Sequence, residues 1–128
     1  MVLLTPVITS ASTAQRHARD LSWGLPISQA REWRCKYTPA KDDAPLKGAF
    51  SLLRRYQPMI RATPGFRSIT HSICRVKHEL KVAITVDEHA YGPWEANAFE
   101  PEPGVTSELA SLAGIANVET QSFIMSVG

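Results

Sequence analysis

The chain has 128 residues, of which 44% are hydrophobic and 20% charged, as in ordinary globular proteins. This length is enough for one domain with its own core, so stability need not come from disulfides or a metal. No apolar run approaches the roughly 20 residues that cross a bilayer, so we expect no transmembrane segment. The two cysteines, Cys35 and Cys74, are too few for a disulfide framework, which predicts reduced thiols and an intracellular location.

Charge is divided unevenly along the chain. Residues 1–81 carry all 14 bases and five acids, whereas residues 82–128 carry seven acids and no base. Such a division is compatible with a nucleic-acid surface on the first part or with two parts that complement each other inside one fold. The pattern of elements described below favours complementarity.

Residues 1–30 are rich in Ser, Thr and Ala and contain no acid before Asp20. This composition is typical of a mitochondrial or plastid transit peptide, and an N-terminal tail is the alternative. We also consider an extension that lies along a partner subunit. The predicted division is therefore an extension or transit-like segment over 1–30 and a domain over 31–128.

The first elements of the domain are a strand and a helix. Alternation over 32–36 predicts a half-buried strand. Asp43 can cap a following helix and Pro45 fits its first turn, so we expect a helix over 45–57. Pro58 should kink that helix before Pro64 and Gly65 end it.

Two strands, two helices and a last strand follow. Alternating apolar residues predict strands over 66–76 and 80–87, joined by a hairpin. We expect a short helix near 93–99, a second over 107–113, and a strand over 118–127 with Phe123 and Met125 facing the core. Because each helix has one apolar side, the elements should form two layers.

The predicted fold is an α+β, two-layer ferredoxin-like plait (βαββαβ), with a four-stranded antiparallel sheet, both helices on one face, and an N-terminal extension. The expected core is Trp33, Cys35, Tyr37, Phe50, Leu53, Ile69, Ile73, Val82, Ile84, Leu109, Leu112, Phe123 and Met125. The expected open face of the sheet is Arg34, Lys36, Ser68, Thr70, Ser72, Lys81, Thr85, Thr120 and Ser122.

Two short stretches carry a family resemblance. The helix-to-strand segment 109–120, from Leu109 through Gly114 to Thr120, is similar to that of leucine-responsive regulator effector domains. It also resembles the dimeric α+β barrel group that includes antibiotic-biosynthesis monooxygenases, as does the turn from Ala62 to Phe66. The resemblance implies a ferredoxin-like plait and pairing of sheets between subunits.

No catalytic, metal or cofactor site is predicted. His71, Cys74 and His78 have a metal-like spacing, but residues three apart on a strand point to opposite faces. Neither cysteine has a base assigned to it by the sequence. The group formed by residues 87–91, with Asp87 and His89, is typical of a solvated strand end.

Three functions remain open, and enzyme activity is undecided, with the balance against it. The first is a non-enzymatic structural or accessory subunit of a larger, possibly organellar, assembly, whose partner contacts would be Trp94, Phe99, Arg54 and Arg55. The second is a dimeric α+β barrel enzyme or small-ligand binder, monooxygenase-like, with an intersheet pocket of Arg34, Thr70, Ser72, Cys74 and Thr85. The third is a ribosomal-type protein that binds the RNA backbone through Arg54 and Arg55, although the open face lacks an aromatic platform for bases.

Overall fold

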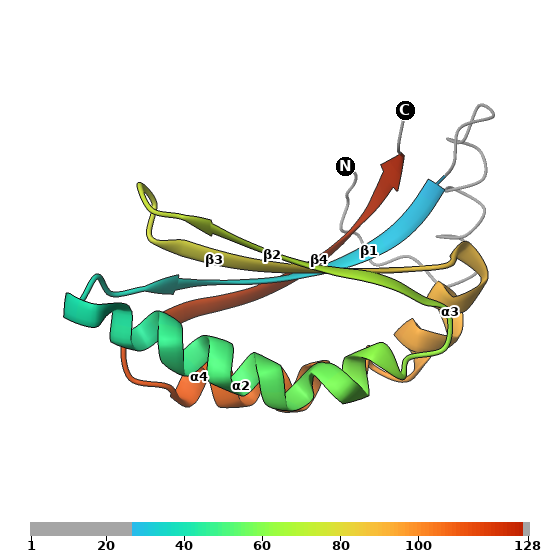
Figure 1. Ribbon diagram of the computed structural model, residues 1–128. Helices are drawn as coiled ribbons and strands as arrows, with labels where there is room; N and C mark the ends of the chain where they lie inside the picture. The colour runs from blue at the N-terminus through green and yellow to red at the C-terminus, as the bar shows by residue number, and fades with distance from the viewer. Residues whose placement is uncertain (1–26, 127–128) are drawn as a thin grey trace.

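The computed structural model describes residues 27–126, so the prediction for the N-terminal extension falls outside it except at residues 27–30. The chain forms a ferredoxin-like α+β plait (Figure 1), as predicted. In order the elements are β1 (Ile27–Tyr37), a 3-10 turn (Lys41–Asp43), α2 (Ala44–Arg61), β2 (Phe66–Cys74), β3 (Glu79–Val86), α3 (Glu88–Ala96), α4 (Glu102–Ser111) and β4 (Ile115–Ser126).

The four strands form one antiparallel sheet in the order β2-β3-β1-β4. Helices α2 and α4 run along the same face of this sheet, and α3 lies at one end (Figure 1). The core lies between the two layers, and Trp33, Ile60, Leu80, Ile84 and Val105 are among its most buried side chains. Among the described residues the other face of the sheet carries no helix, as predicted for an open face, although Ala30, Glu32 and Thr85 on that face are buried.

Helix α2 differs from its prediction at both ends. Asp43 has a positive φ of 53° and makes no side-chain cap, because its carboxylate instead accepts a hydrogen bond from Arg75 at 3.0 Å. The helix also runs through Pro58 to Arg61, although proline removes the bond to the carbonyl four residues earlier. Burial of Ile60 in the core beyond the proline favours this continuation.

The orientation of β4 is the main correction to the predicted core. Thr120 and Ser122 accept hydrogen bonds from Arg31 on the helix-covered face, so neither lies on the open face. Phe123 pairs with Ala30 instead, on the open face, and Met125 is 37% exposed. The pairing of β4 with β1 shifts by one residue between Arg34 and Lys36. This shift decides which side chains of β4 face the helices and which face the open side.

Ile73 is also more exposed than expected. It lies on the helix-facing side of β2 but retains 37% exposure, because β2 forms an edge of the sheet. Phe50, Ile69 and Leu112 pack against the core while remaining partly exposed.

Candidate functional site

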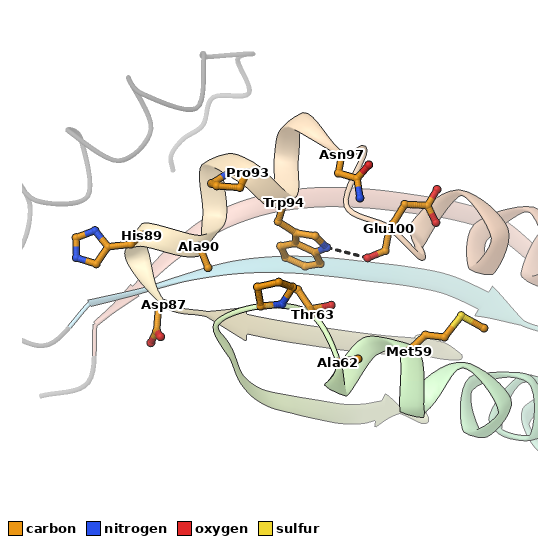
Figure 2. A pocket seen from close by; sticks show the side chains of 11 residues that line it. Met59, Ala62, Thr63, Asp87, His89, Ala90, Pro93, Trp94, Asn97 and Glu100 are labelled. Atoms are coloured by element: carbon orange, nitrogen blue, oxygen red, sulfur yellow. Dashed lines mark hydrogen bonds between the residues drawn. The ribbon is translucent and has the colours of Figure 1, made fainter.

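A pocket of about 540 Å³ opens between the end of α2 and helix α3 (Figure 2). Its apolar lining consists of Met59, Ala62, Pro64, Ala90, Pro93 and Trp94. Its polar lining consists of Thr63, Asp87, His89, Asn97 and Glu100. The site therefore combines an apolar wall with a few polar groups, which is the usual composition of a small-molecule pocket.

Trp94 forms the fixed aromatic part of this wall. Its indole N–H donates to the main-chain carbonyl of Glu100 at 2.9 Å. Phe99 packs edge-on against the same ring at a centroid distance of 5.1 Å, and Trp94 is only 6% exposed. The hydrogen bond and the packing together hold the indole in one orientation.

A tight junction between β2 and α3 positions the pocket. The main-chain N–H of Asp87 donates to the carbonyl of Gly65 at 2.9 Å. Gly65 has a φ of 78°, and a Cβ there would lie 2.3 Å from the Cβ of Ala90. Only glycine allows α3 to lie this close to the start of β2.

The charged side chains of the pocket lie at its rim. Figure 2 shows the imidazole of His89 and the carboxylate of Asp87 directed away from Trp94. Arg67 lies 3.7 Å from the Asp87 carboxylate, and both side chains are about half exposed. The interior near the indole is consequently apolar.

A largely buried ion pair lies beyond the pocket, between β1 and α4. The guanidinium of Arg31 donates to Glu102 from Nε at 2.7 Å and from a terminal nitrogen at 2.8 Å. The Trp33 indole N–H donates to the same carboxylate at 2.8 Å, and Arg31 lies 4.1 Å from the centre of the Phe99 ring. The side chains of Arg31 and Glu102 are 15% and 12% exposed, so this network fixes α4 and the loop before it on the sheet.

Sequence reasoning did not find this network. Arg31 lies at the first residue of the expected domain, and Glu102 lies in a stretch without clear periodicity. Neither residue is marked by a motif, because their contact joins positions 71 apart in the chain. The pocket is likewise not marked by a motif, because its walls come from two helices and no local sequence pattern indicates that these helices meet.

The five residues predicted for an intersheet pocket share the open face of the sheet. Arg34 lies on β1 beside Lys81, which pairs in turn with Ser72 on β2. Arg34 donates to Glu119 at 2.9 Å, and Thr85 shares a 2.6 Å hydrogen bond with Ser68. The pocket described above lies elsewhere, so use of Arg34, Thr70, Ser72, Cys74 and Thr85 by a ligand stays a prediction.

The residues predicted for partner contact do not form one exposed patch. Trp94 and Phe99 are buried, at 6% and 8% exposure, and pack over the end of the core. The sequence is compatible both with a docking patch and with packing over the end of the core, and the two rings adopt the second arrangement. Arg54 is exposed on α2, while Arg55 donates to Glu108 of α4 at 2.8 Å. Whether a partner contacts any of the four stays a prediction.

Within residues 27–126, no group of three His, Cys, Asp or Glu side chains is placed to hold a metal ion. No helix in the same range is both long and apolar enough to cross a membrane.

No known family model matches the chain, and no curated protein sequence matches it significantly. Solved structures do match its fold. One is a mutant of SnoaB, described as a cofactor-independent oxygenase from Streptomyces nogalater, at a TM-score of 0.52 and 14% identity, covering 78% of this chain and 92% of that one. Another is the ActVA-Orf6 monooxygenase of Streptomyces coelicolor with the ligand nanaomycin D, at a TM-score of 0.54 and 16% identity, covering 80% and 88%.

At these identities the likeness shows a common fold. The resemblance to antibiotic-biosynthesis monooxygenases that the segment from Leu109 to Thr120 indicated is therefore confirmed at the level of the fold. Neither structure supports an accessory subunit or an organellar location.

Proposed function

We propose that the chain is a small-ligand protein of the monooxygenase type, and that the pocket between α2 and α3 binds a flat, mainly apolar ligand. The observation that carries the proposal is the apolar wall around the fixed indole of Trp94. Its volume of about 540 Å³ lies within the usual range of small-molecule sites, roughly 300–1,000 Å³. A fused-ring ligand could pack against the indole of Trp94. The entropic cost of this contact would be small, because the indole is already held in one orientation.

The fold likeness supports the class of chemistry. SnoaB is described as a cofactor-independent oxygenase, and ActVA-Orf6 as a monooxygenase with bound nanaomycin D. In an oxidation without a cofactor, the ligand itself supplies the electrons. A ring methylene and O₂ then give a ring carbonyl and water, so that all atoms balance.

Such a step needs a proton acceptor. Among the lining residues the candidates are Asp87, His89 and Glu100, and Figure 2 shows His89 directed away from Trp94. The apolar interior thus supports binding more directly than it supports catalysis. Binding is accordingly the part of the proposal to be tested first.

The test is calorimetric titration of the full chain with a panel of fused-ring phenols that carry a ring methylene and of the quinones that their oxidation would give, followed by oxygen-electrode assays with the methylene compounds that bind. Ala62→Phe should fill the pocket and reduce affinity at least tenfold, because Ala62 is an exposed part of its lining. Ala110→Phe on the exposed face of α4 is the matched control and should leave affinity unchanged.

Two outcomes would overturn this placement. One is an absence of binding by any member of the panel. The other is a loss of binding on Thr70→Phe but not on Ala62→Phe, which would move the ligand to the open face of the sheet predicted from the sequence.

A further inference from the structure

The hairpin between β2 and β3 carries an exposed apolar side chain at its tip. Residues 75–78 form the turn, and Val76 within it is 90% exposed. Arg75 and Lys77 precede and follow Val76, and both are exposed. Single exposed apolar residues are common on protein surfaces. This one differs because it lies at the tip of a hairpin with a base on each side, so an apolar group and positive charge face the same partner.

Contacts with β1 hold this turn in place. The carbonyl of His78 accepts a hydrogen bond from the main-chain N–H of Tyr37 at 2.9 Å, and the two rings pack edge-on at 5.6 Å. The amine of Lys36 donates to the carbonyl of Lys77 at 3.2 Å, which brings a third base to the turn. A tip that is already ordered loses little conformational entropy when it binds.

More bases lie at the same end of the molecule. The ion pair of Arg75 with Asp43, at 3.0 Å, joins the turn to the start of α2, and Figure 1 shows both at one end of the protein. We define this basic end as residues 36–47 and 75–81, which contain six bases and three acids. Two of these acids pair with Arg75 and Lys81. Among the described residues, four bases of the basic end form no ion pair: Lys36, Lys41, Lys47 and Lys77.

The opposite end of the molecule is acidic. Residues 87–100, which include α3, contain four acids and no lysine or arginine. Figure 1 shows α3 at the end of the sheet away from the β2–β3 hairpin. In the field of a negatively charged surface, this division of charge would turn the basic end toward the surface.

A membrane surface that contains anionic lipid offers both kinds of contact that the hairpin presents. Its headgroups attract lysine and arginine, and the boundary between headgroups and acyl chains accepts an apolar side chain. A nucleic-acid backbone would also attract the bases, but its phosphates bind charged and polar groups and would leave Val76 in water. The exposed Val76 therefore favours a lipid surface over a nucleic acid.

We propose that the β2–β3 hairpin docks the protein reversibly on an anionic phospholipid surface, with Val76 among the headgroups and the lysines of the basic end against the phosphates. Such binding combines electrostatic attraction with apolar contact, so it depends on anionic lipid. The α2–α3 pocket borders the acidic end, and the proposal does not depend on a ligand there.

Co-sedimentation of the full chain with lipid vesicles tests the surface. Vesicles of phosphatidylcholine mixed with phosphatidylserine should bind the chain, whereas vesicles of phosphatidylcholine alone should not. Binding should weaken as the salt concentration rises, because salt screens the attraction between the lysines and the headgroups. Equal binding to both kinds of vesicle, or binding to neither, would overturn the proposal.

Two variants test the hairpin itself. Lys77→Ala should weaken binding to the mixed vesicles about fivefold, which is the usual contribution of one base near an anionic surface. Val76→Asn leaves the charge unchanged and removes the apolar contact, so it should weaken binding by about three- to tenfold.

Arg54→Ala is the matched control. Arg54 is an exposed base of α2 that lies about 15 Å along the helix from its first residue. This distance exceeds the Debye length of about 8 Å at physiological salt, so binding to the mixed vesicles should not change. A loss for Arg54→Ala as large as that for Lys77→Ala would overturn the assignment to the hairpin.

Fluorescence anisotropy with a single-stranded RNA tests the other class of partner. We expect Val76→Asn to weaken binding to mixed vesicles and the wild type to prefer those vesicles to the RNA. The proposal is wrong if the chain binds the RNA and not the vesicles, with an affinity that Lys77→Ala reduces and Val76→Asn does not. The basic end would then be a surface for a phosphate backbone.

Discussion

The Glu102 carboxylate accepts hydrogen bonds from two nitrogens of Arg31 and from the indole of Trp33 inside the protein. Glu102→Ala removes the counter-charge and leaves a guanidinium that is 15% exposed without its partner. Loss of one member of a buried pair typically costs about 3–5 kcal/mol. Urea unfolding should therefore show a decrease of that order in the free energy of unfolding.

The matched control for this prediction is Glu119→Ala. The Arg34–Glu119 pair has a similar length of 2.9 Å, but its side chains are 35% and 58% exposed. Because solvent screens this exposed pair, Glu119→Ala should lower the free energy of unfolding by only about 0–1 kcal/mol. Equal losses for the two variants would show that the buried network does not hold α4 on the sheet.

Burial of the Cys35 thiol, with a further effect of the Glu79 carboxylate, raises its pKa to about 11. In the unfolded chain the thiol ionises near its ordinary pKa of about 9. The folded form therefore holds the proton more tightly, and this contribution to stability is complete below pH 9 and lost as the pH rises toward 11.

The measurement is the free energy of unfolding between about pH 8 and 11, which spans both pKa values of the thiol. We expect a decrease with pH in the wild type that is smaller in Cys35→Ala. At about pH 8.5 a thiol reagent should label one cysteine of the folded chain, the exposed Cys74, and two after unfolding. Labelling of both cysteines in the folded state would contradict the burial of Cys35.

Among the elements, the junction of β2 with α3 is the most constrained. Gly65→Ala introduces a side chain at a φ of 78° and places it 2.3 Å from the Cβ of Ala90. We expect a loss of about 1–3 kcal/mol, measured by urea unfolding, because strain and overlap add. Displacement of α3 should also weaken ligand binding in the pocket.

Gly48 provides the control for Gly65. It lies within α2, and a Cβ there meets no atom within 4 Å. Gly48→Ala should raise the free energy of unfolding by about 0.5–1 kcal/mol, because alanine favours the helix. A stabilising Gly65→Ala would mean that the junction can relax without cost.

The elements also show how far the sequence could predict this fold. Alternation of Trp33, Cys35 and Tyr37, and of Val82 and Ile84, identified both central strands, because each has one fully buried side. The same rule failed for Phe123 on β4. Thr120 and Ser122 face the helices and bind Arg31, and no single-strand pattern reveals such a partner.

The candidate site was less predictable for a related reason. The sequence shows Trp94 only as an aromatic residue in a proline-rich stretch, whereas its burial depends on Phe99 and on the Glu100 carbonyl after α3. Met59 and Ala62 lie beyond the expected end of the first helix, since Pro58 was expected to interrupt it. The pocket therefore lies between the expected kink after Pro58 and the expected short helix near 93–99, and no local pattern predicts that these two segments meet.

In the folded molecule, several bases from the first part of the chain form ion pairs with acids from the last part. Four ion pairs of the described residues join a base from residues 1–81 to an acid from residues 82–128: Arg31–Glu102, Arg34–Glu119, Arg55–Glu108 and Arg67–Asp87. The predicted complementarity of the two parts is thus confirmed in these pairs. Because Arg55 is engaged with Glu108, the basic face of α2 offers less free charge to a phosphate backbone than the sequence indicates.

Fluorescence anisotropy with a single-stranded RNA distinguishes internal pairing from a ribosomal-type function. We expect no more than weak binding at about 150 mM salt, and no change in it on Arg54→Ala with Arg55→Ala. A phosphate-binding helix would instead give an affinity whose logarithm falls by about 0.7 per contacted phosphate for each tenfold rise in salt. In the double variant the affinity of such a helix would also depend less steeply on salt concentration, because two of the cations that contact phosphates would be missing. That result would return the basic helix to a role in binding RNA, whereas a flat response leaves Arg55 to stabilise the contact of α2 with α4 through Glu108.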